Sequence, residues 1–148
     1  MKVTALILAA GAGTRMKSDL PKVLHPLCGK PMLWHVLEVL KKVSSEEPVV
    51  VVGQGADQVL NFVKDAAVCV RQEPQLGTAH AALTAEALIK NKTDYVIITY
   101  ADMPLLQSHT FERLIQTQRA NSGPLTLLTV SSPDPRGFGR IEIGRAHV

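Results

Sequence analysis

The sequence has only two cysteines, Cys28 and Cys69. They are too few for the disulfide framework of a small secreted protein, and they lack the paired spacing of a zinc site. We therefore expect reduced thiols in a cytoplasmic protein. No apolar run approaches the roughly 20 residues that a membrane-spanning helix needs, so we predict no membrane insertion. The apolar residues 3–12 imitate a signal-peptide core, but Arg15 and Lys17 follow closely, and a buried first strand explains the run better.

The chain also has little excess charge. Its 16 Lys and Arg stand against 13 Asp and Glu, which gives a formal net charge of +3, and no block of like charges concentrates it. This balance suits an anionic small molecule and predicts no nucleic-acid partner. Repeats and low-complexity tracts are absent too. With 46% hydrophobic and 20% charged residues, the composition is that of a globular domain with a real core.

Short apolar runs alternate with segments of helical period along the chain. This alternation is typical of βα units, and it predicts an α/β fold with one doubly wound, mostly parallel sheet. The expected strands are residues 3–8, 49–52, 68–70, 95–100 and 125–130. The expected helices are residues 32–43, 56–63, 79–89 and 108–120, the last two capped by Thr78 and Ser108.

The most informative segment begins where the first predicted strand ends. It reads Leu8-Ala9-Ala10-Gly11-Ala12-Gly13-Thr14-Arg15-Met16, and Leu20-Pro21-Lys22 follows after a short gap. Glycines at the carboxyl end of a strand let backbone N–H groups approach a phosphate, because no Cβ intervenes. Arg15 and Lys22 add a planar cation and a point cation, which suit the spread charge of a polyphosphate.

Two common phosphate loops do not match this segment. A dinucleotide fingerprint needs glycine at the position of Met16, and the Gly-Lys-Ser/Thr of a Walker A loop is absent. An ordinary glycine turn with two solvated cations is the purely structural interpretation.

The segment resembles the signature of the nucleotidyltransferases that activate sugar phosphates, in which a Gly-rich loop wraps the nucleoside triphosphate. Further segments resemble the uridylyltransferase half of the bifunctional bacterial GlmU family: residues 18–25, 29–32, 75–81 and 137–141. They occur in the expected order over residues 3–141. The resemblance implies a Rossmann-like nucleotidyltransferase fold that is incomplete in this chain.

The resemblance also implies roles for individual residues. Arg15 and Lys22 should face the triphosphate as catalytic cations. The nucleotide should be held by Leu8, Ala9, Ala10, Gly11, Gly13, Thr14, Gln72, Gly77 and Thr78. The sugar phosphate should lie against Tyr100, Ala101 and Gly139. The family commonly has glycine in place of Ala101, a difference that either crowds the sugar phosphate or has no effect.

Asp102 follows the predicted strand of residues 95–100. A carboxylate there can hold Mg²⁺, which bridges phosphate oxygens and offsets the charge that builds up during transfer. Taken alone, Asp102 is better interpreted as a turn residue, but its agreement with the family's metal-binding aspartate favours a metal ligand. The histidines have no common metal-ligand spacing and are interpreted as loop, cap or surface residues: His25, His35, His80 and His109.

The resemblance implies that further groups lie beyond this chain. In the family these are a sugar-binding glutamate and asparagine, an asparagine of the metal site, and an acetyltransferase domain. We therefore expect residues 1–141 to be the N-terminal part of a nucleotidyltransferase domain. Residues 142–148 look foreign, because the codons GAG ATC GGA AGA GCA CAC GTC can encode them and resemble a sequencing adapter. An assembly artefact is the expectation, and a divergent natural end is the alternative.

By resemblance, the expected reaction makes UDP-N-acetylglucosamine from UTP and N-acetylglucosamine 1-phosphate, with Mg²⁺ as cofactor and release of pyrophosphate. The product feeds peptidoglycan precursors, and the full-length parent is expected to be a homo-oligomer. The fragment alone is expected to be inactive. Two alternatives stay open: a thymidylyl- or cytidylyltransferase, against which residues 75–78 and 137–141 argue, and a nucleotide-binding fragment without catalysis.

Overall fold

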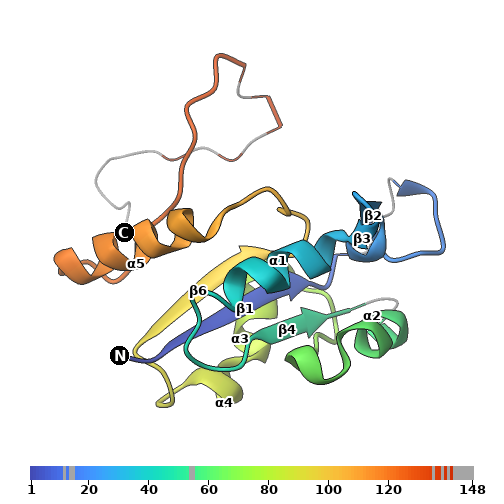
Figure 1. The fold of residues 1–148 in the computed structure, drawn as a ribbon, viewed down its shortest axis with the longest axis horizontal. Coiled ribbons are helices and arrows are strands. Elements are labelled where there is room, and N and C mark those ends of the chain that lie inside the picture. Colours follow the sequence, from blue (N-terminus) through green and yellow to red (C-terminus); the bar gives the residue numbers. More distant parts are fainter. Residues whose placement is uncertain are drawn as a thin grey trace.

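A parallel four-stranded sheet forms the centre of the molecule (Figure 1). The computed structural model describes residues 1–11, 13, 16–53, 56–134, 136–137, 139 and 141. The strands are β1 (Val3–Ala9), β4 (Val49–Val52), β5 (Val68–Arg71) and β6 (Tyr95–Tyr100), in the order β5-β4-β1-β6. Every neighbouring pair is parallel. All residues of β1 and β4 are buried, which explains why β4 is continuously apolar and β1 is apolar except at Thr4.

Helices cover both faces of this sheet. One buried cluster joins β1 to α1 (Met32–Leu40), α2 (Ala56–Val63) and α5 (Ser108–Ala120). A second cluster joins the other face to α3 (Thr78–Thr84) and α4 (Glu86–Ile89). The predicted doubly wound α/β fold is therefore confirmed. None of the helices in the described part of the chain is long and apolar enough to cross a membrane.

Two predicted helices differ from their apolar pattern, one by ending early and the other by being interrupted. The helix expected over residues 32–43 stops at Leu40, because Ser44 and Ser45 turn toward β1 and exchange hydrogen bonds with the backbone of Val3. The helix expected over residues 79–89 is divided at Ala85 into α3 and α4. In α3 the Thr84 hydroxyl donates to the His80 carbonyl one turn earlier, at 2.8 Å, and such bonds tend to bend a helix.

The two predicted capping residues are also misplaced. Thr78 and Ser108 are the first residues of α3 and α5, and the N-cap positions belong to Gly77 and Gln107 without a side-chain cap bond. Gly77 has φ +98°, which a residue with a Cβ rarely adopts, so the turn into α3 is made by the glycine.

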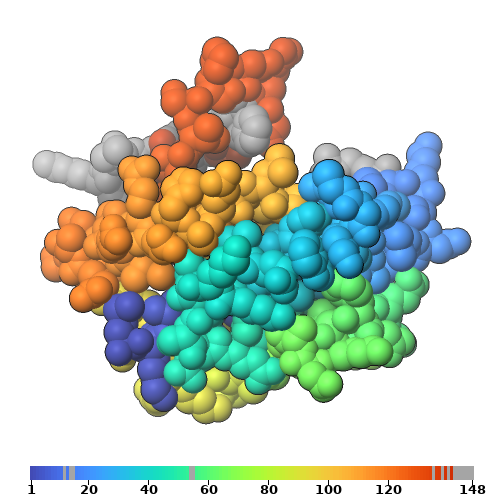
Figure 2. Space-filling view, in the orientation of Figure 1, coloured from blue at the N-terminus to red at the C-terminus, as the bar shows by residue number. Residues whose placement is uncertain are grey.

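The predicted strand over residues 125–130 is wrong. This segment has no strand conformation, and its large side chains are exposed: Leu125, Leu127, Leu128 and Val130. Figure 1 shows it standing away from the sheet beyond α5, and in Figure 2 the same segment protrudes from the surface. A strand needs a neighbour to complete its backbone hydrogen bonds, and among the described residues β6 pairs only with β1.

A small hairpin lies between β1 and α1, which the sequence did not indicate. The 3₁₀ turn η2 (Lys22–Leu24) leads into β2 (Pro26–Leu27) and β3 (Lys30–Pro31), which pair antiparallel. Another 3₁₀ turn, η3 (Lys64–Ala66), follows α2. Both cysteines are free: Cys28 is exposed at the hairpin turn, and Cys69 is partly buried on β5. Burial raises the pKa of the Cys69 thiol.

Candidate functional site

The strand order reverses between β1 and β6. The chain runs outward from β1 through β4 to β5, and then returns to place β6 on the opposite side of β1. At such a switch point, the loops after the two strands run in opposite directions and leave a crevice at the carboxyl ends, where ligands bind in open α/β sheets. In this chain, the two loops follow Ala9 and Tyr100.

A pocket of about 710 Å³ lies at this position. Most of the predicted site residues line it: Leu8, Ala9, Ala10, Gly11, Gly13, Lys22, Gln72, Gly77, Thr78, Tyr100 and Asp102. Other lining residues had not been singled out: Met16, Val23, Gln75 and Ala81. All of these lie within the sequence motifs, so motif membership was the available signal for them.

The remaining predicted residues do not line the pocket or cannot be placed. Ala101 is fully buried, packs in the cluster on the α1 face, and donates its N–H to the Leu8 carbonyl at 3.0 Å. Its methyl group is therefore a core contact. Gly139 is exposed outside the pocket. Thr14 and Arg15, together with residues 142–148, lie outside the described residues, and the role predicted for each stays a prediction.

Position 13 requires a glycine because of its backbone conformation and its close contact with Lys22. Its φ is +59°, and a Cβ at this position would lie 2.9 Å from the Cβ of Lys22. The glycine thus removes both a backbone strain of about 1–2 kcal/mol and a steric overlap. The Gly13 carbonyl accepts the N–H of Met16 at 2.9 Å. The glycine loop and Lys22 are consequently packed as one unit.

An ion pair joins this unit to the end of β6. Lys22 Nζ donates to Asp102 Oδ2 at 2.5 Å, and both side chains are about one third exposed, at 34% and 35%. A pair this accessible contributes no more than about 1 kcal/mol to stability. It places a cation and a carboxylate at the mouth of the pocket, and it is weak enough to be exchanged for ligand contacts.

The side-chain amide of Gln72 is held from two sides. Gln72 is 4% exposed, and its Nε2 lies 3.0 Å from the Gly77 carbonyl oxygen and 3.0 Å from Nδ1 of His80. These contacts connect the end of β5 with the start of α3. The sequence indicated Gln72 and Gly77 only through the family resemblance, and it gave no indication that His80 takes part.

Gln75 links the loop before α3 to the glycine loop. Its Nε2 donates to the Ala10 carbonyl at 2.7 Å, across 65 positions of sequence. Gly53 at the end of β4 makes room for this bond, because a Cβ there would lie 2.3 Å from Gln75 Nε2 and 2.6 Å from the Ala10 oxygen. The sequence did not indicate Gln75 or Gly53 as individual site residues, although Gly53 ends a predicted strand.

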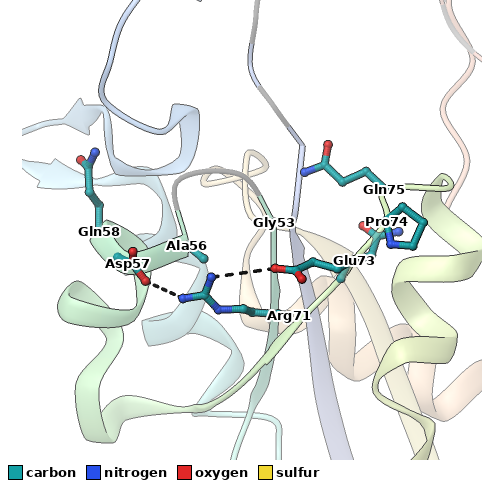
Figure 3. A pocket seen from close by; sticks show the side chains of 9 residues that line it. Gly53, Ala56, Asp57, Gln58, Arg71, Glu73, Pro74 and Gln75 are labelled. Carbon is teal, nitrogen blue, oxygen red and sulfur yellow. Dashed lines mark hydrogen bonds and ion pairs between the residues drawn. The ribbon is translucent and has the colours of Figure 1, made fainter.

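A second pocket, of about 520 Å³, lies beside the first, and Gln72 and Gln75 line both. Figure 3 shows Arg71 between Asp57 and Glu73. These side chains are about half exposed or more, so the ion pairs are weak. Because two carboxylates already balance the guanidinium, this pocket suits a polyphosphate less well than the one beside the glycine loop.

The metal chemistry of the first pocket depends on a single carboxylate. Within the described part of the chain, no group of three or more His, Cys, Asp or Glu residues is arranged to hold a metal ion. Mg²⁺ is commonly bound by one or two carboxylates together with substrate phosphates and water. Asp102 therefore fits a cation that arrives with a phosphate ligand.

Comparison with known proteins agrees with the motifs and the fold. The chain is 49% identical over 137 residues to the bifunctional protein GlmU of Thermus thermophilus and 44% identical over 137 residues to that of Shouchella clausii. These matches cover 92% and 93% of the chain but 30% of each relative, so the chain spans less than a third of their length. The resemblance to the GlmU family is thus confirmed.

Solved structures share the fold. A synthetase for CMP-2-keto-3-deoxy-manno-octonic acid, solved with CTP, has a TM-score of 0.62 at 26% identity, over 82% of this chain and 48% of its own. A Mycobacterium tuberculosis protein solved with manganese has a TM-score of 0.66 at 23% identity, over 81% of this chain and 61% of its own. The family model of the MobA-like NTP transferase domain matches residues 5–136, and the chain therefore belongs to this family of nucleotidyltransferases.

Proposed function

We propose that this chain carries the nucleotide-binding part of a uridylyltransferase. The reaction joins UTP and N-acetylglucosamine 1-phosphate to UDP-N-acetylglucosamine and releases pyrophosphate. The observation that carries the proposal is the pocket between β1 and β6, because residues from three separate GlmU-like motifs line it together. The identity of 42–49% to GlmU proteins supports the choice of uridine and of an N-acetylated sugar phosphate.

The proposed nucleotide contacts come from two sides of the pocket. The backbone of Leu8 to Gly11, with Gln72, Gly77 and Thr78, holds the uridine. Gly13, Thr14, Arg15 and Lys22 surround the triphosphate. Backbone N–H groups and two cations suit the negative charge of this anion.

The sugar phosphate is proposed to bind on the β6 side. Tyr100 lines the pocket there and is half exposed, so its ring is available to a ligand. Ala101 supports that wall from the core, and Gly139 is proposed to approach the sugar from the C-terminal segment. Because Ala101 is buried in the core, its methyl group is proposed not to crowd the sugar phosphate.

Asp102 is the proposed ligand of Mg²⁺. Asp102 would hold the cation together with the phosphates of UTP, and the cation would supply positive charge that offsets the charge built up during transfer. Lys22 now neutralises the Asp102 carboxylate at 2.5 Å. In the nucleotide complex, Lys22 is proposed to leave this carboxylate for a phosphate oxygen, so that the Asp102 carboxylate becomes free for the cation.

The chemistry is a direct displacement. An oxygen of the sugar phosphate attacks the α-phosphorus of UTP, the new P–O bond forms as the bond to the bridging oxygen breaks, and pyrophosphate leaves with the electron pair. No covalent enzyme intermediate is needed, so the chain contributes positioning and charge stabilisation.

The test measures pyrophosphate release with UTP, N-acetylglucosamine 1-phosphate and Mg²⁺, for this chain and for the complete product of its gene. Lys22→Gln should lower kcat by about 100-fold, the size expected for loss of a charge-stabilising group. Lys41→Gln is the matched control, because Lys41 lies at the exposed end of α1 and pairs only weakly with Glu38. Equal turnover with CTP or dTTP, or full activity of Lys22→Gln, contradicts the proposal.

Calorimetry separates binding from catalysis in the same proteins. UTP binding without pyrophosphate release supports a nucleotide-binding chain that lacks the groups for catalysis. That outcome is consistent with the proposed nucleotide contacts of Lys22 and Gln72, and it means that the reaction requires a longer polypeptide.

A further inference from the structure

His80 is a candidate for setting which base the pocket accepts, although it does not line the pocket. It lies in the first turn of α3 and is partly buried. Its Nδ1 is 3.0 Å from Nε2 of Gln72, a side chain that does line the pocket. Any effect of His80 on a ligand therefore passes through the Gln72 amide.

The orientation of that amide follows from the atoms around it. The Gly77 carbonyl oxygen, 3.0 Å from the amide, can only accept a hydrogen bond. The amide atom that faces it must be the nitrogen, because two oxygens at this distance repel each other. The same nitrogen faces His80, so its two hydrogens are directed to Gly77 and to the imidazole.

This arrangement also selects the tautomer of His80. An amide N–H needs an acceptor, so Nδ1 of His80 carries no proton and the neutral ring carries its hydrogen on Nε2. With both N–H groups of Gln72 used, the Oε1 atom is the part of this amide left for a ligand. It presents an acceptor and no donor.

We propose that His80 is a specificity-determining positioning residue, which holds Gln72 so that its oxygen receives the N–H of a uracil ring. This inference rests on the proposed nucleotide function and extends it to base selection. Uracil carries a hydrogen on ring N3, whereas the ring N3 of cytosine carries a lone pair. An amide oxygen attracts the former and repels the latter.

Without His80, one N–H of a 4% exposed amide loses its partner. The amide then gains by rotating toward other acceptors, and the pocket no longer receives a fixed oxygen. We expect the ratio of UTP to CTP affinity to fall about tenfold, which equals about 1.4 kcal/mol.

The experiment compares two substitutions at this position in the full chain. In His80→Asn, Oδ1 of the amide takes the place of Nδ1 and can still accept the bond from Gln72. In His80→Leu, a side chain of similar bulk offers no acceptor. Calorimetric titration with UTP and with CTP should give wild-type selectivity for His80→Asn and about a tenfold loss for His80→Leu, while urea unfolding shows that both variants are folded.

The proposal is overturned if folded His80→Leu keeps the full preference for UTP, or if His80→Asn loses as much as His80→Leu. A second measurement is independent of nucleotide. Long-range ¹H–¹⁵N NMR of the imidazole should show the proton of His80 on Nε2, and a proton on Nδ1 overturns the inference outright. A wild-type chain that binds neither UTP nor CTP contradicts the proposed function, while the NMR result still decides whether His80 orients Gln72.

Discussion

Gly53→Ala should damage both the fold and the pocket, because Gly53 lies where three loops meet. A Cβ at Gly53 would lie 2.3 Å from Gln75 Nε2, 2.6 Å from the Ala10 oxygen and 3.1 Å from the Ala10 Cα. The first atom is the end of a flexible side chain and can move. The Ala10 atoms belong to the backbone that leaves β1, and moving them shifts the start of the glycine loop.

The expected cost has two parts. Overpacking at a backbone contact costs about 1–3 kcal/mol. Loss of the Gln75–Ala10 hydrogen bond adds about 1 kcal/mol. Gly53→Ala should therefore lower the free energy of unfolding by about 2–4 kcal/mol, and at 2–4 °C per kcal/mol the melting temperature should fall by about 4–16 °C.

Urea denaturation followed by circular dichroism measures this change. Gly123→Ala is the matched control, since a Cβ there meets nothing within 4 Å and the φ of Gly123 is not positive. It should stay within about 0.5 kcal/mol of the wild type. Gln75→Ala alone should cost about 1 kcal/mol.

The double variant Gly53→Ala with Gln75→Ala isolates the backbone contact. It should remain clearly less stable than Gln75→Ala, because the overlap with Ala10 persists. If the two are equally stable, the clash is confined to the Gln75 amide, and Gly53 does not hold the backbone of the pocket.

Three further predictions concern other parts of the chain. Asp102→Asn in the complete enzyme should abolish most Mg²⁺-dependent pyrophosphate release while the circular dichroism spectrum stays unchanged, and Asp65→Asn is the control. Near-normal rates of Asp102→Asn at limiting Mg²⁺ would show that Asp102 is only a turn residue. Cys28 should be alkylated by iodoacetamide faster than Cys69, because Cys28 is exposed, whereas burial raises the pKa of the Cys69 thiol and lowers its thiolate fraction. Equal alkylation rates measured by peptide mass spectrometry would contradict the burial of Cys69. Amides of residues 125–130 should exchange with deuterium faster than those of β6, and strong protection there would restore the predicted strand.

The centre of the sheet could be predicted because its two inner strands, β1 and β4, are buried on both faces. β1 and β4 are apolar at almost every position, and such runs separated by helical periods leave few alternatives to a parallel sheet. The helix ends could not be predicted in the same way. The end of α1 depends on hydrogen bonds of Ser44 and Ser45 to Val3, which is about 40 positions away.

The segment of residues 125–130 shows the limit of a local pattern. Its apolar residues satisfy the sequence criteria for a strand, but strand formation depends on a neighbour that supplies backbone partners. Among the described residues no neighbour is present on that side of β6. The pattern records the preference of the residues, and the tertiary context decides whether it is realised.

The sequence indicated those residues of the candidate site that belong to motifs, but not those that take part only through tertiary contacts. The glycine loop and Asp102 stand out because each follows a predicted strand, and Lys22 stands out through the Leu20-Pro21-Lys22 segment. The bonds from Gln72 to His80 and from Gln75 to Ala10 depend on how the loop before α3 folds back, and no spacing in the sequence reports that path.

The two halves of the pocket differ in how firmly they are held, and this difference bears on the proposed reaction. On the β5 side, bonds of Gln72 and Gln75 fix the proposed uridine contacts from within the protein. On the β6 side, Lys22 packs against Gly13 and is linked to the end of the sheet by its accessible ion pair with Asp102. A fixed amide can select a base without rearrangement, whereas an exposed ion pair can exchange partners at a cost of about 1 kcal/mol or less. Base selection should therefore precede the exchange of Lys22 from Asp102 to phosphate, so that a nucleotide with the wrong base is rejected before the proposed metal site is freed.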